Sequence, residues 1–508
     1  MRGLGETGRR AARWVKDFLR SERANTAMIF ALASVSLFTA SGAGIDMARA
    51  MMVKTRLAGA LDAAALAVGT TSGLNNDQLT TMAQHYFDAN YPATSIGTHA
   101  PVSVSVDGQH MTLSVSGTVP TTLLQILNID DLSLTVTNEV VRAVTKLRVA
   151  LVLDNTGSMS QTDNTGTSKI DALKTATHQL LTQLQNAAVN TGDVQVSIVP
   201  FSLDVNSGTA NVNAEWLGWS DWEAPPPNSM PPANVGPGSS CPYSTGTSPY
   251  GYRCTNSPAN GASTTNTIPS SGTYAGYICP GVDNGRYNAG RRGHYYNGCY
   301  DSVRVGSSYT HTWHPNNHNT WAGCIMDRAR DYDTNNSAPS AGSSGSLFPS
   351  ENNTYCPPVT LTALSTDWTS LNTKVDEMTP NGSTNQTIGL AWGWQALSRG
   401  IPLNAPAADS TVQNVIVLLS DGLNTQDRWY GDGVNQSTDV DARMALACSN
   451  AKAANVRIYT VLVMSGNSSV LQSCATDSSK YFALSTAGEI VTAFNTIGTE
   501  LANLHLAR

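Results

Sequence analysis

Charged residues are scarce in this chain. They make up 13% of its 508 residues, and the formal net charge is −7. A weakly acidic chain lacks the electrostatic footprint of a nucleic-acid-binding protein, so we expect no nucleic-acid partner. Ser, Thr, Asn and Gly are abundant instead, a composition that favours a cell-surface or periplasmic protein over a cytosolic enzyme. The length excludes one compact core and predicts two or three domains.

Several motifs of redox and nucleotide chemistry are also missing. The chain has no C-x-x-C pair, no phosphate-binding P-loop and no glycine-rich dinucleotide motif. Its eight cysteines favour disulfides formed in an oxidising compartment. Near the C-terminus we expect a bridge between Cys448 and Cys474, the alternative being two buried free thiols. The other six lie in one loop-rich region: Cys241, Cys254, Cys279, Cys299, Cys324 and Cys356.

The N-terminal region has the pattern of a membrane anchor. Residues 1–24 form a basic head, and residues 25–46 are uncharged until Asp46, close to the length of a membrane-spanning helix. The basic flank is expected to stay in the cytoplasm of a bacterium. We therefore predict one uncleaved inner-membrane helix, with the later domains periplasmic or surface-exposed. Small residues at 40–43 leave a cleavable signal peptide as the alternative.

The remaining chain divides by composition and periodicity. Residues 47–98 predict a helical stalk, and residues 99–146 predict a small α+β module that contains a β-hairpin. Strands and helices then alternate over 147–206 and 360–508, which predicts an α/β domain with a doubly wound, mostly parallel sheet. Residues 207–359 interrupt this pattern as an insertion rich in Cys, Tyr and Gly, which we expect to be stapled by disulfides.

Two segments of the predicted α/β domain are expected to be helical. Residues 361–378 predict a helix at the point where the α/β domain resumes. The helical spacing of apolar residues over 169–187 predicts a further helix of that domain.

Two strands of the predicted sheet end in carboxylates. The apolar run 149–153 predicts a buried strand that ends at Asp154, and Thr156 and Ser158 follow it. Carboxylate and hydroxyl oxygens are the ligands that Mg²⁺ prefers, and ligands bind at the carboxyl ends of strands in such sheets. A plain turn or a helix cap is the alternative. Thr384 in a polar loop and Asp421, which follows the second strand, add further oxygen donors.

The order of these features along the chain resembles the metal-ion-dependent adhesion site of the von Willebrand factor A family. The features are D-x-T-x-S, then a loop threonine, then a strand followed by Asp-Gly. The resemblance implies a von Willebrand A, Rossmann-like fold. It implies that Mg²⁺, or Mn²⁺ or Ca²⁺, is bound, and that an Asp or Glu side chain of a protein partner completes the coordination. Thr156 stands where the family more often has Ser, and it keeps the ligand oxygen. The implied metal ligands are Asp154, Thr156, Ser158, Thr384 and Asp421.

The anchor resembles a second family. The N-terminal region is similar to the N-terminal module of Tad (Flp) pilus-assembly proteins. The shared features are a basic head, a membrane helix, Asp46 followed by an arginine, and the Ala-rich LDAAALA (61–67). A generic Ala-rich stalk helix is the alternative for the second half. With the α/β domain, the chain resembles a TadG-like protein. This implies a membrane-anchored, metal-dependent module in pilus assembly, anchoring or surface adhesion, with pilus-assembly or envelope components as partners.

Catalysis is not expected. A hydrolase that activates water on the metal needs a positioned base, and the three site stretches contain no histidine. Two further functions stay open: an A-domain subunit of a cytosolic chelatase or AAA-type machine, and a structural minor-pilin-like protein with a vestigial metal site.

The insertion holds three weaker candidates. The histidines of HTWHPNNHNTW, with Cys324, have the residue types of a zinc or copper site. The stretch DYDTN (331–335) imitates the start of a calcium loop but lacks its later positions, so we expect a solvated turn. An aromatic group forms either a contact surface or a compact core. The residues are His311, His314 and His318 for the first candidate, and Tyr295, Tyr296, Tyr300, Trp313 and Trp321 for the aromatic group.

Overall fold

The fold comes from a computed structural model, and the chain divides into two compact units. The first comprises Met1–Ala143 and Leu506–Arg508, and the second Val144–His505. The residues that the structure describes are Lys16 and the ranges 22–71, 74–92, 97–107, 110–141, 145–225, 252–255, 264–265, 275–280, 297–305, 308–352, 356–407, 410–464 and 466–506.

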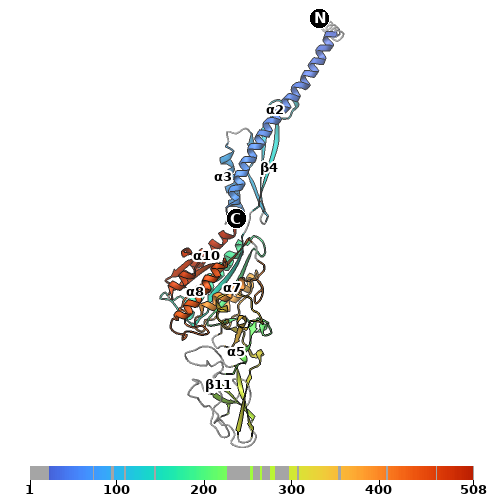
Figure 1. Ribbon diagram of the computed structural model, residues 1–508. Helices are drawn as coiled ribbons and strands as arrows, with labels where there is room; N and C mark the ends of the chain where they lie inside the picture. The colour runs from blue at the N-terminus through green and yellow to red at the C-terminus, as the bar shows by residue number, and fades with distance from the viewer. Residues whose placement is uncertain are drawn as a thin grey trace. The chain divides into compact units, whose positions relative to one another are not determined.

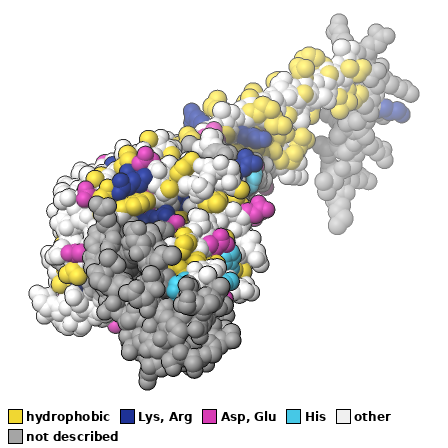
Figure 2. Space-filling model, turned by 60° about the horizontal axis from the view of Figure 1, so that its bottom comes forward, with side chains coloured by type: hydrophobic (Ala, Val, Ile, Leu, Met, Phe, Trp, Pro, Cys, Tyr) yellow, Lys and Arg dark blue, Asp and Glu magenta, His cyan; other side chains and the backbone are white. Residues whose placement is uncertain are grey.

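One helix dominates the first unit. Helix α2 (Glu22–Gly69) runs through the predicted membrane segment and into the predicted stalk without a break. Its N-terminal part extends away from the rest of the unit (Figure 1), and hydrophobic side chains cover the projecting part (Figure 2). Between Ile29 and Phe38 the large apolar side chains are 61–72% exposed. By length and composition, Met28–Gly69 contains a stretch able to cross a membrane.

The second half of α2 packs on a small α+β layer. Helix α3 (Asn76–Asn90) begins with a capping box, in which Asn75 and Gln78 satisfy each other's backbone N–H groups. An antiparallel sheet is formed by β1 (Thr98–His99), β2 (Ser103–Asp107), β3 (His110–Pro120) and β4 (Asp131–Val141). Side chains of β3 alternate between buried and exposed, so one face of the sheet closes on Leu57 and Leu61 of α2.

A five-stranded parallel sheet forms the centre of the second unit, in the order β18-β17-β16-β5-β6. The predicted parallel α/β sheet is thereby confirmed. Strands β5 and β16 lie in the middle of the sheet, and apart from their first residues they are buried on both faces. This burial explains their unbroken apolar sequences. The strands are β5 (Lys146–Asp154), β6 (Val194–Phe201), β16 (Val412–Ser420), β17 (Arg457–Val463) and β18 (Tyr481–Leu484).

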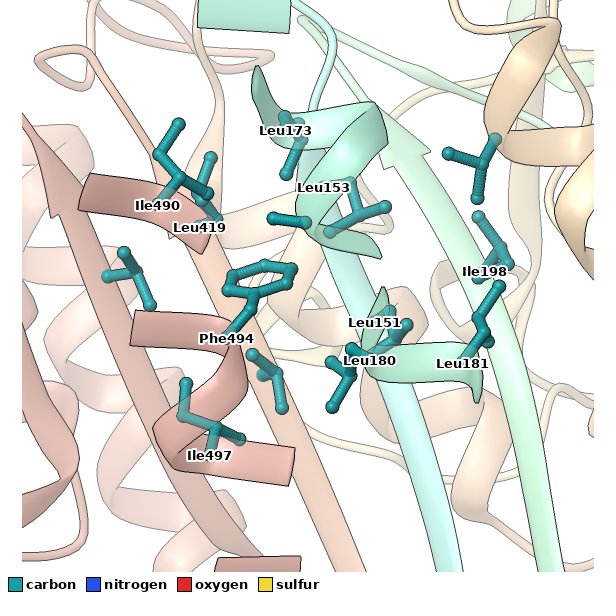
Figure 3. Close-up of a cluster of buried hydrophobic side chains, with 14 of the residues drawn as sticks. Leu151, Leu153, Leu173, Leu180, Leu181, Ile198, Leu419, Ile490, Phe494 and Ile497 are labelled. Carbon is teal, nitrogen blue, oxygen red and sulfur yellow. The ribbon is translucent and has the colours of Figure 1, made fainter. Parts of the chain in front are cut away.

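Helices cover both faces of this sheet. On one face, α4 (Lys169–Ala187), α6 (Trp368–Asp376) and α10 (Glu489–Leu506) contribute to a continuous apolar core. Figure 3 shows α4 and α10 directing Leu180 and Phe494 onto the sheet. The other face is covered by α7 (Gln386–Leu397), α8 (Thr438–Ala453) and α9 (Ser468–Cys474).

Close packing of α7 depends on two glycines. A Cβ at Gly389 would lie 2.7 Å from the Phe201 ring, and one at Gly393 would lie 2.5 Å from a Val152 methyl group. Both approaches are too short for any side chain, so glycine lets the helix lie directly on the sheet. This contact also positions the loop that precedes α7, which carries Thr384.

The insertion, together with β7 just before it, forms two smaller sheets. Short strands pair in the order β7-β14-β15-β8, and a second, antiparallel sheet contains β9 to β13. The bounds of the first set are β7 (Val205–Asn206), β8 (Leu217–Gly218), β14 (Cys324–Ile325) and β15 (Phe348–Glu351). Those of the second set are β9 (Tyr252–Thr255), β10 (Thr264–Thr265), β11 (Ala275–Pro280), β12 (Gly298–Val305) and β13 (Ser308–Pro315).

In the described part of the chain, the structure shows two disulfides with both of their cysteines. Cys324 pairs with Cys356 within the C-terminal part of the insertion. Cys448 pairs with Cys474 and joins α8 to α9, so the predicted C-terminal bridge is confirmed.

The helix predicted over 361–378 is wrong in its first half. Helix α6 begins only after Asp367, whose side chain accepts a hydrogen bond from the Ser370 N–H. Before this cap the chain is extended, and Ser365 exchanges backbone hydrogen bonds with Val196 of β6. Pairing with a sheet edge therefore outweighs the local helical periodicity.

Candidate metal centre

Two neighbouring strands bring the predicted carboxylates to one edge of the sheet. Strands β5 and β16 are parallel, with Leu153 opposite Leu419. Asp154 is the last residue of β5, and Asp421 follows Ser420, the last residue of β16. Both side chains therefore lie at the carboxyl edge, where ligands bind in open α/β sheets.

The Asp154 carboxylate is fully buried and held on both oxygens. Its Oδ1 accepts the Thr156 N–H at 2.8 Å, and its Oδ2 accepts the Ser420 hydroxyl at 2.6 Å. Burial, together with the nearby Asp421 carboxylate, raises the pKa of Asp154 to about 7. Two carboxylates brought together in this way favour a cation between them.

The hydroxyl groups of the first loop connect the two carboxylates. Thr156 begins the 3-10 turn η2 (Gly157–Ser160), and its hydroxyl oxygen lies 3.0 Å from that of Ser158. The half-buried Ser158 hydroxyl donates to Asp421 Oδ1 at 2.7 Å. Four of the five predicted ligands therefore form one connected set.

Thr384 reaches the same place from the loop before α7. A Cβ on Gly422 would lie 3.2 Å from Thr384 Oγ1 and 3.8 Å from Ser158 Oγ, so both hydroxyls flank this glycine. The Gly157 N–H also donates to the Gly382 carbonyl at 3.0 Å and ties the two loops together. Ser158, Thr384 and Asp421 line one open pocket. The structure thus brings all five predicted side chains together.

A lysine that the sequence analysis missed also belongs to this site. Lys169 is the first residue of α4, and its Nζ lies 2.6 Å from Asp421 Oδ2. The two side chains are only 4% and 0% exposed. In the sequence, nothing distinguishes Lys169 from any other residue in the first turn of a helix. Only the placement of the α4 N-terminus at the carboxyl edge reveals its role.

Buried polar residues support the ligands from behind. Gln386 donates from Nε2 to the Ser420 hydroxyl at 2.9 Å and to the Gly422 carbonyl at 3.0 Å. Asn385 caps α7 and donates from its side chain to Asp327 Oδ2 at 2.8 Å. Because Asp327 belongs to the insertion, the insertion helps to fix the loop that carries Thr384.

The donor set fits a hard divalent cation. The five side chains offer only carboxylate and hydroxyl oxygens, which suit Mg²⁺, Mn²⁺ or Ca²⁺ better than softer metals. Among the described residues, no group of three or more His, Cys, Asp or Glu side chains is placed to hold a metal ion. Metal binding at this site would therefore depend on the hydroxyls as well as on the two carboxylates.

The histidines and Cys324 of the insertion are not brought together. Cys324 is disulfide-bonded, and the His318 ring stacks on Trp219 at 3.7 Å between centroids. His311 and His314 lie three positions apart on β13 and so point to opposite faces. A zinc or copper site of these residues is not formed.

The expected solvated turn at DYDTN is wrong in one respect. Residues Tyr332–Thr334 form a 3-10 turn, and Asp333 is only 3% exposed. Arg443 of α8 forms ion pairs with Asp331 and Asp333. The acidic residues therefore attach the insertion to α8, because a buried carboxylate needs a cationic partner.

The aromatic residues of the insertion mainly form a core. Trp321 and Tyr300 are 2% and 4% exposed, and Trp313 packs edge-on against Tyr300. The predicted residues Tyr295 and Tyr296 lie outside the described residues. A broad aromatic contact surface is thus not formed by the described members of the group.

One family profile matches part of the chain. Residues 24–71 match the Tad family, described as "Putative Flp pilus-assembly TadE/G-like". The matched segment coincides with most of α2, including the apolar run, Asp46 and the Ala-rich segment. No curated protein matches the chain.

Several solved structures are similar to parts of it. The pilus adhesin SpaC of Lactobacillus rhamnosus GG is 12% identical, with 81% of this chain and 37% of SpaC covered and a TM-score of 0.33. The von Willebrand factor domain of the type V pili tip protein Mfa5 of Porphyromonas gingivalis is 9% identical (72% and 97% covered, TM-score 0.34). Proximal thread matrix protein 1 of the mussel byssus, with a zinc-occupied MIDAS motif, is 11% identical (72% and 47% covered, TM-score 0.29). The chain spans less than half the length of SpaC and of the byssus protein.

Proposed function

We propose that this chain is a membrane-anchored, divalent-metal-dependent protein-binding module that acts in the assembly or anchoring of a Tad-type pilus, or in surface adhesion. One observation carries the proposal. Five oxygen-bearing side chains from three separate segments meet at the carboxyl edge of one parallel sheet. The bond from Ser158 to Asp421 joins residues 263 positions apart.

The charge of the site suits binding rather than catalysis. Asp154 and Asp421 carry two negative charges, of which Lys169 offsets part, and the hydroxyls add donors without adding charge. A cation held in this way keeps affinity for one more anionic ligand, such as an Asp or Glu side chain of a protein partner. The open pocket beside Ser158 and Thr384 gives such a side chain access. We propose that the α/β unit is a von Willebrand A domain with this mode of binding.

The N-terminal helix supports the cellular part of the proposal. The match of residues 24–71 to the Tad family and the exposed apolar run of α2 both favour a membrane anchor. The basic residues that precede the run favour a cytoplasmic N-terminus, with the metal site outside the inner membrane. Partners would then be pilus-assembly or envelope proteins. We propose no catalytic activity, because no histidine belongs to the described site.

The test compares metal binding and partner capture in two variants of the full chain. Asp154→Ala is expected to abolish binding of Mn²⁺, followed by electron paramagnetic resonance, and capture of pilus components in crosslinked cells. Asp171→Ala, on the exposed first turn of α4, is the matched control and is expected to change neither. Unchanged circular dichroism of both variants would show that the fold persists. Partner capture by Asp154→Ala at the level of the unmodified chain would contradict the proposal.

A second candidate is a structural pilus protein whose metal site is vestigial. The ion pair between Lys169 and Asp421 favours it, because the buried ammonium already supplies a positive charge to one of the two carboxylates. This candidate predicts no divalent-metal binding by the unmodified chain at millimolar Mg²⁺ or Mn²⁺. The binding module predicts saturable binding that Asp154→Ala removes.

A further inference from the structure

The turn between β3 and β4 in the first unit exposes an apolar tip that the metal site does not use. It covers residues 121–130, and we call it the β3–β4 turn. Ile126, Leu127 and Ile129 are 68%, 52% and 39% exposed. Three large aliphatic side chains on one short turn are an unusual exposure for a water-surrounded surface.

A buried carboxylate of the anchor helix holds this turn. Asp46 of α2 is 2% exposed and accepts the backbone N–H groups of Thr122 at 3.0 Å, Leu123 at 2.8 Å and Leu124 at 2.9 Å. Arg49, one turn along α2, donates to the Thr122 hydroxyl. Charge-assisted bonds to three successive N–H groups fix the turn against the helix.

The contacts also give the direction in which the tip extends. Thr122 is held at the level of Arg49, whereas Leu123 packs so closely on Gly42 that a Cβ there would lie 2.6 Å from the Leu123 Cβ. The chain therefore runs from the base of the turn toward the N-terminal, apolar part of α2. At the opposite end of the hairpin, Val140 of β4 contacts Gly69. The tip thus lies at the end of the first unit nearest to the apolar run.

The level of the turn matches the end of the membrane-spanning stretch. The uncharged run of α2 ends at Asp46, and about 20 residues of helix cross the hydrocarbon core. Gly42 and Asp46 are about 6 Å apart along the helix axis, so the turn lies beside the last helical turn of this run. Lys54 and Arg56, both exposed, follow on the outer side, where lipid headgroups attract cations.

We propose that the β3–β4 turn inserts Ile126, Leu127 and Ile129 into the interface of the bilayer that α2 crosses. The inference rests on the membrane anchor of the proposed function. The exposed Asp130 and Asp131 at the base of the turn limit the insertion to the tip, because charged groups stay in water. A single helix is free to rotate about its axis in a membrane. A second attachment beside it holds the first unit in one orientation toward the lipid surface.

The test measures depth in the membrane at three positions of the full chain. A fluorescent non-natural amino acid replaces Ile126, Leu32 or Tyr86, one position per variant, and the chains are reconstituted in phosphatidylcholine–phosphatidylglycerol vesicles. Lipids brominated on the acyl chains quench a fluorophore that touches the hydrocarbon region. We expect quenching at 126 and at 32, and none at 86, an exposed position of α3 that serves as the control. Asp46→Asn is expected to reduce quenching at 126 and to leave it unchanged at 32.

The outcomes separate this inference from the anchor. Quenching at 32 without quenching at 126 overturns the insertion of the turn and leaves the anchor in place. Absence of quenching at both positions overturns the anchor and this inference together. A fluorophore at 126 that is shielded only by a second copy of the chain, detected by photo-crosslinked dimers without lipid quenching, also overturns the inference.

Discussion

At the scale of single residues, the site is a balance between two carboxylates, one ammonium and three hydroxyls. Burial of Asp154 and Asp421 at one edge concentrates negative charge, and Lys169 offsets part of it through Asp421 Oδ2. A divalent cation that binds Asp421 has to compete with this ammonium or share the carboxylate with it. In the proposed function, Lys169 would therefore influence the metal affinity of the site together with the five oxygen-bearing side chains.

Replacing Lys169 tests this balance. Lys169→Met keeps most of the apolar stem and removes the charge, so Mg²⁺ is expected to bind at least about tenfold more tightly, or ~1.4 kcal/mol. Isothermal titration of the full chain in detergent measures the change. Lys174→Met, further along the same helix and bonded to the Asp376 carbonyl, is the control and is expected to have no effect. Equal or weaker Mg²⁺ binding by Lys169→Met would show that the ammonium does not oppose the cation.

A second residue predicts the pH dependence of stability. Glu351 is 2% exposed, and burial, with the nearby Asp204 carboxylate, raises its pKa well above the usual range. The folded state therefore favours the protonated form of Glu351. The stability that this carboxyl contributes is fully present below the pKa it has in the unfolded chain, and is lost as the pH rises through its pKa in the folded protein. Glu351→Gln keeps an oxygen acceptor for the Asn352 N–H and cannot ionise.

Thermal unfolding checks this prediction. Glu351→Gln is expected to raise the Tm at pH 8 by a few degrees, about 2–4 °C for each kcal/mol, and to change it little at pH 4. Glu377→Gln, on an exposed side chain, is the control. A Tm difference that is the same at both pH values would contradict the buried ionisation.

Residue patterns predicted the five oxygen donors but not their surroundings. The D-x-T-x-S stretch alone left a plain turn as the alternative. The order of this stretch, the loop threonine Thr384 and the later Asp-Gly resembles the adhesion site of the von Willebrand factor A family, and that resemblance implied the five donors. Lys169, Gln386 and Asp327 act through tertiary contacts with Asp421, Ser420 and Asn385. No spacing in the sequence links these pairs, so only the fold could reveal them.

At the scale of elements, the long periodic segments were predictable and the short ones were not. The helix predicted over 169–187 matches α4, whose apolar residues recur at helical spacing and whose first turn is capped by Ser168. Helix α6 begins later than expected because Ser365 pairs with a strand. The strands β7, β8 and β14 have two residues each, too few for any periodicity, and exist only because the insertion folds back on itself.

The Cys448–Cys474 disulfide between α8 and α9 is expected to contribute measurably to the free energy of unfolding. Its cysteines are 26 residues apart, so the Cys448→Ser, Cys474→Ser double variant is expected to lose about 3 kcal/mol of unfolding free energy. Urea unfolding followed by circular dichroism measures this loss. Ser473→Ala, a small change beside the bridge, serves as the control. An unfolding free energy equal to that of the unmodified chain would mean that the bridge does not restrict the unfolded state.

At the scale of the whole molecule, the proposed function requires both a membrane anchor and a binding site. The first unit carries the apolar helix that matches the Tad family, and the second carries the five-residue site at the edge of its sheet. In the proposed function, the α/β unit that follows the anchor along the chain lies outside the membrane. The site is the part on which the proposed function depends, because the anchor alone would suit any membrane-attached protein.

The most direct test is anomalous X-ray diffraction from crystals of the chain soaked in Mn²⁺. Metal-dependent binding predicts a strong manganese peak within coordination distance, about 2.0–2.6 Å, of oxygens from Asp154, Ser158 and Thr384, or of waters they hold. It also predicts that Lys169 either moves away from Asp421 Oδ2 or shares this carboxylate with the cation. A site without manganese at millimolar concentration, with the Lys169–Asp421 contact intact, would contradict metal-dependent binding.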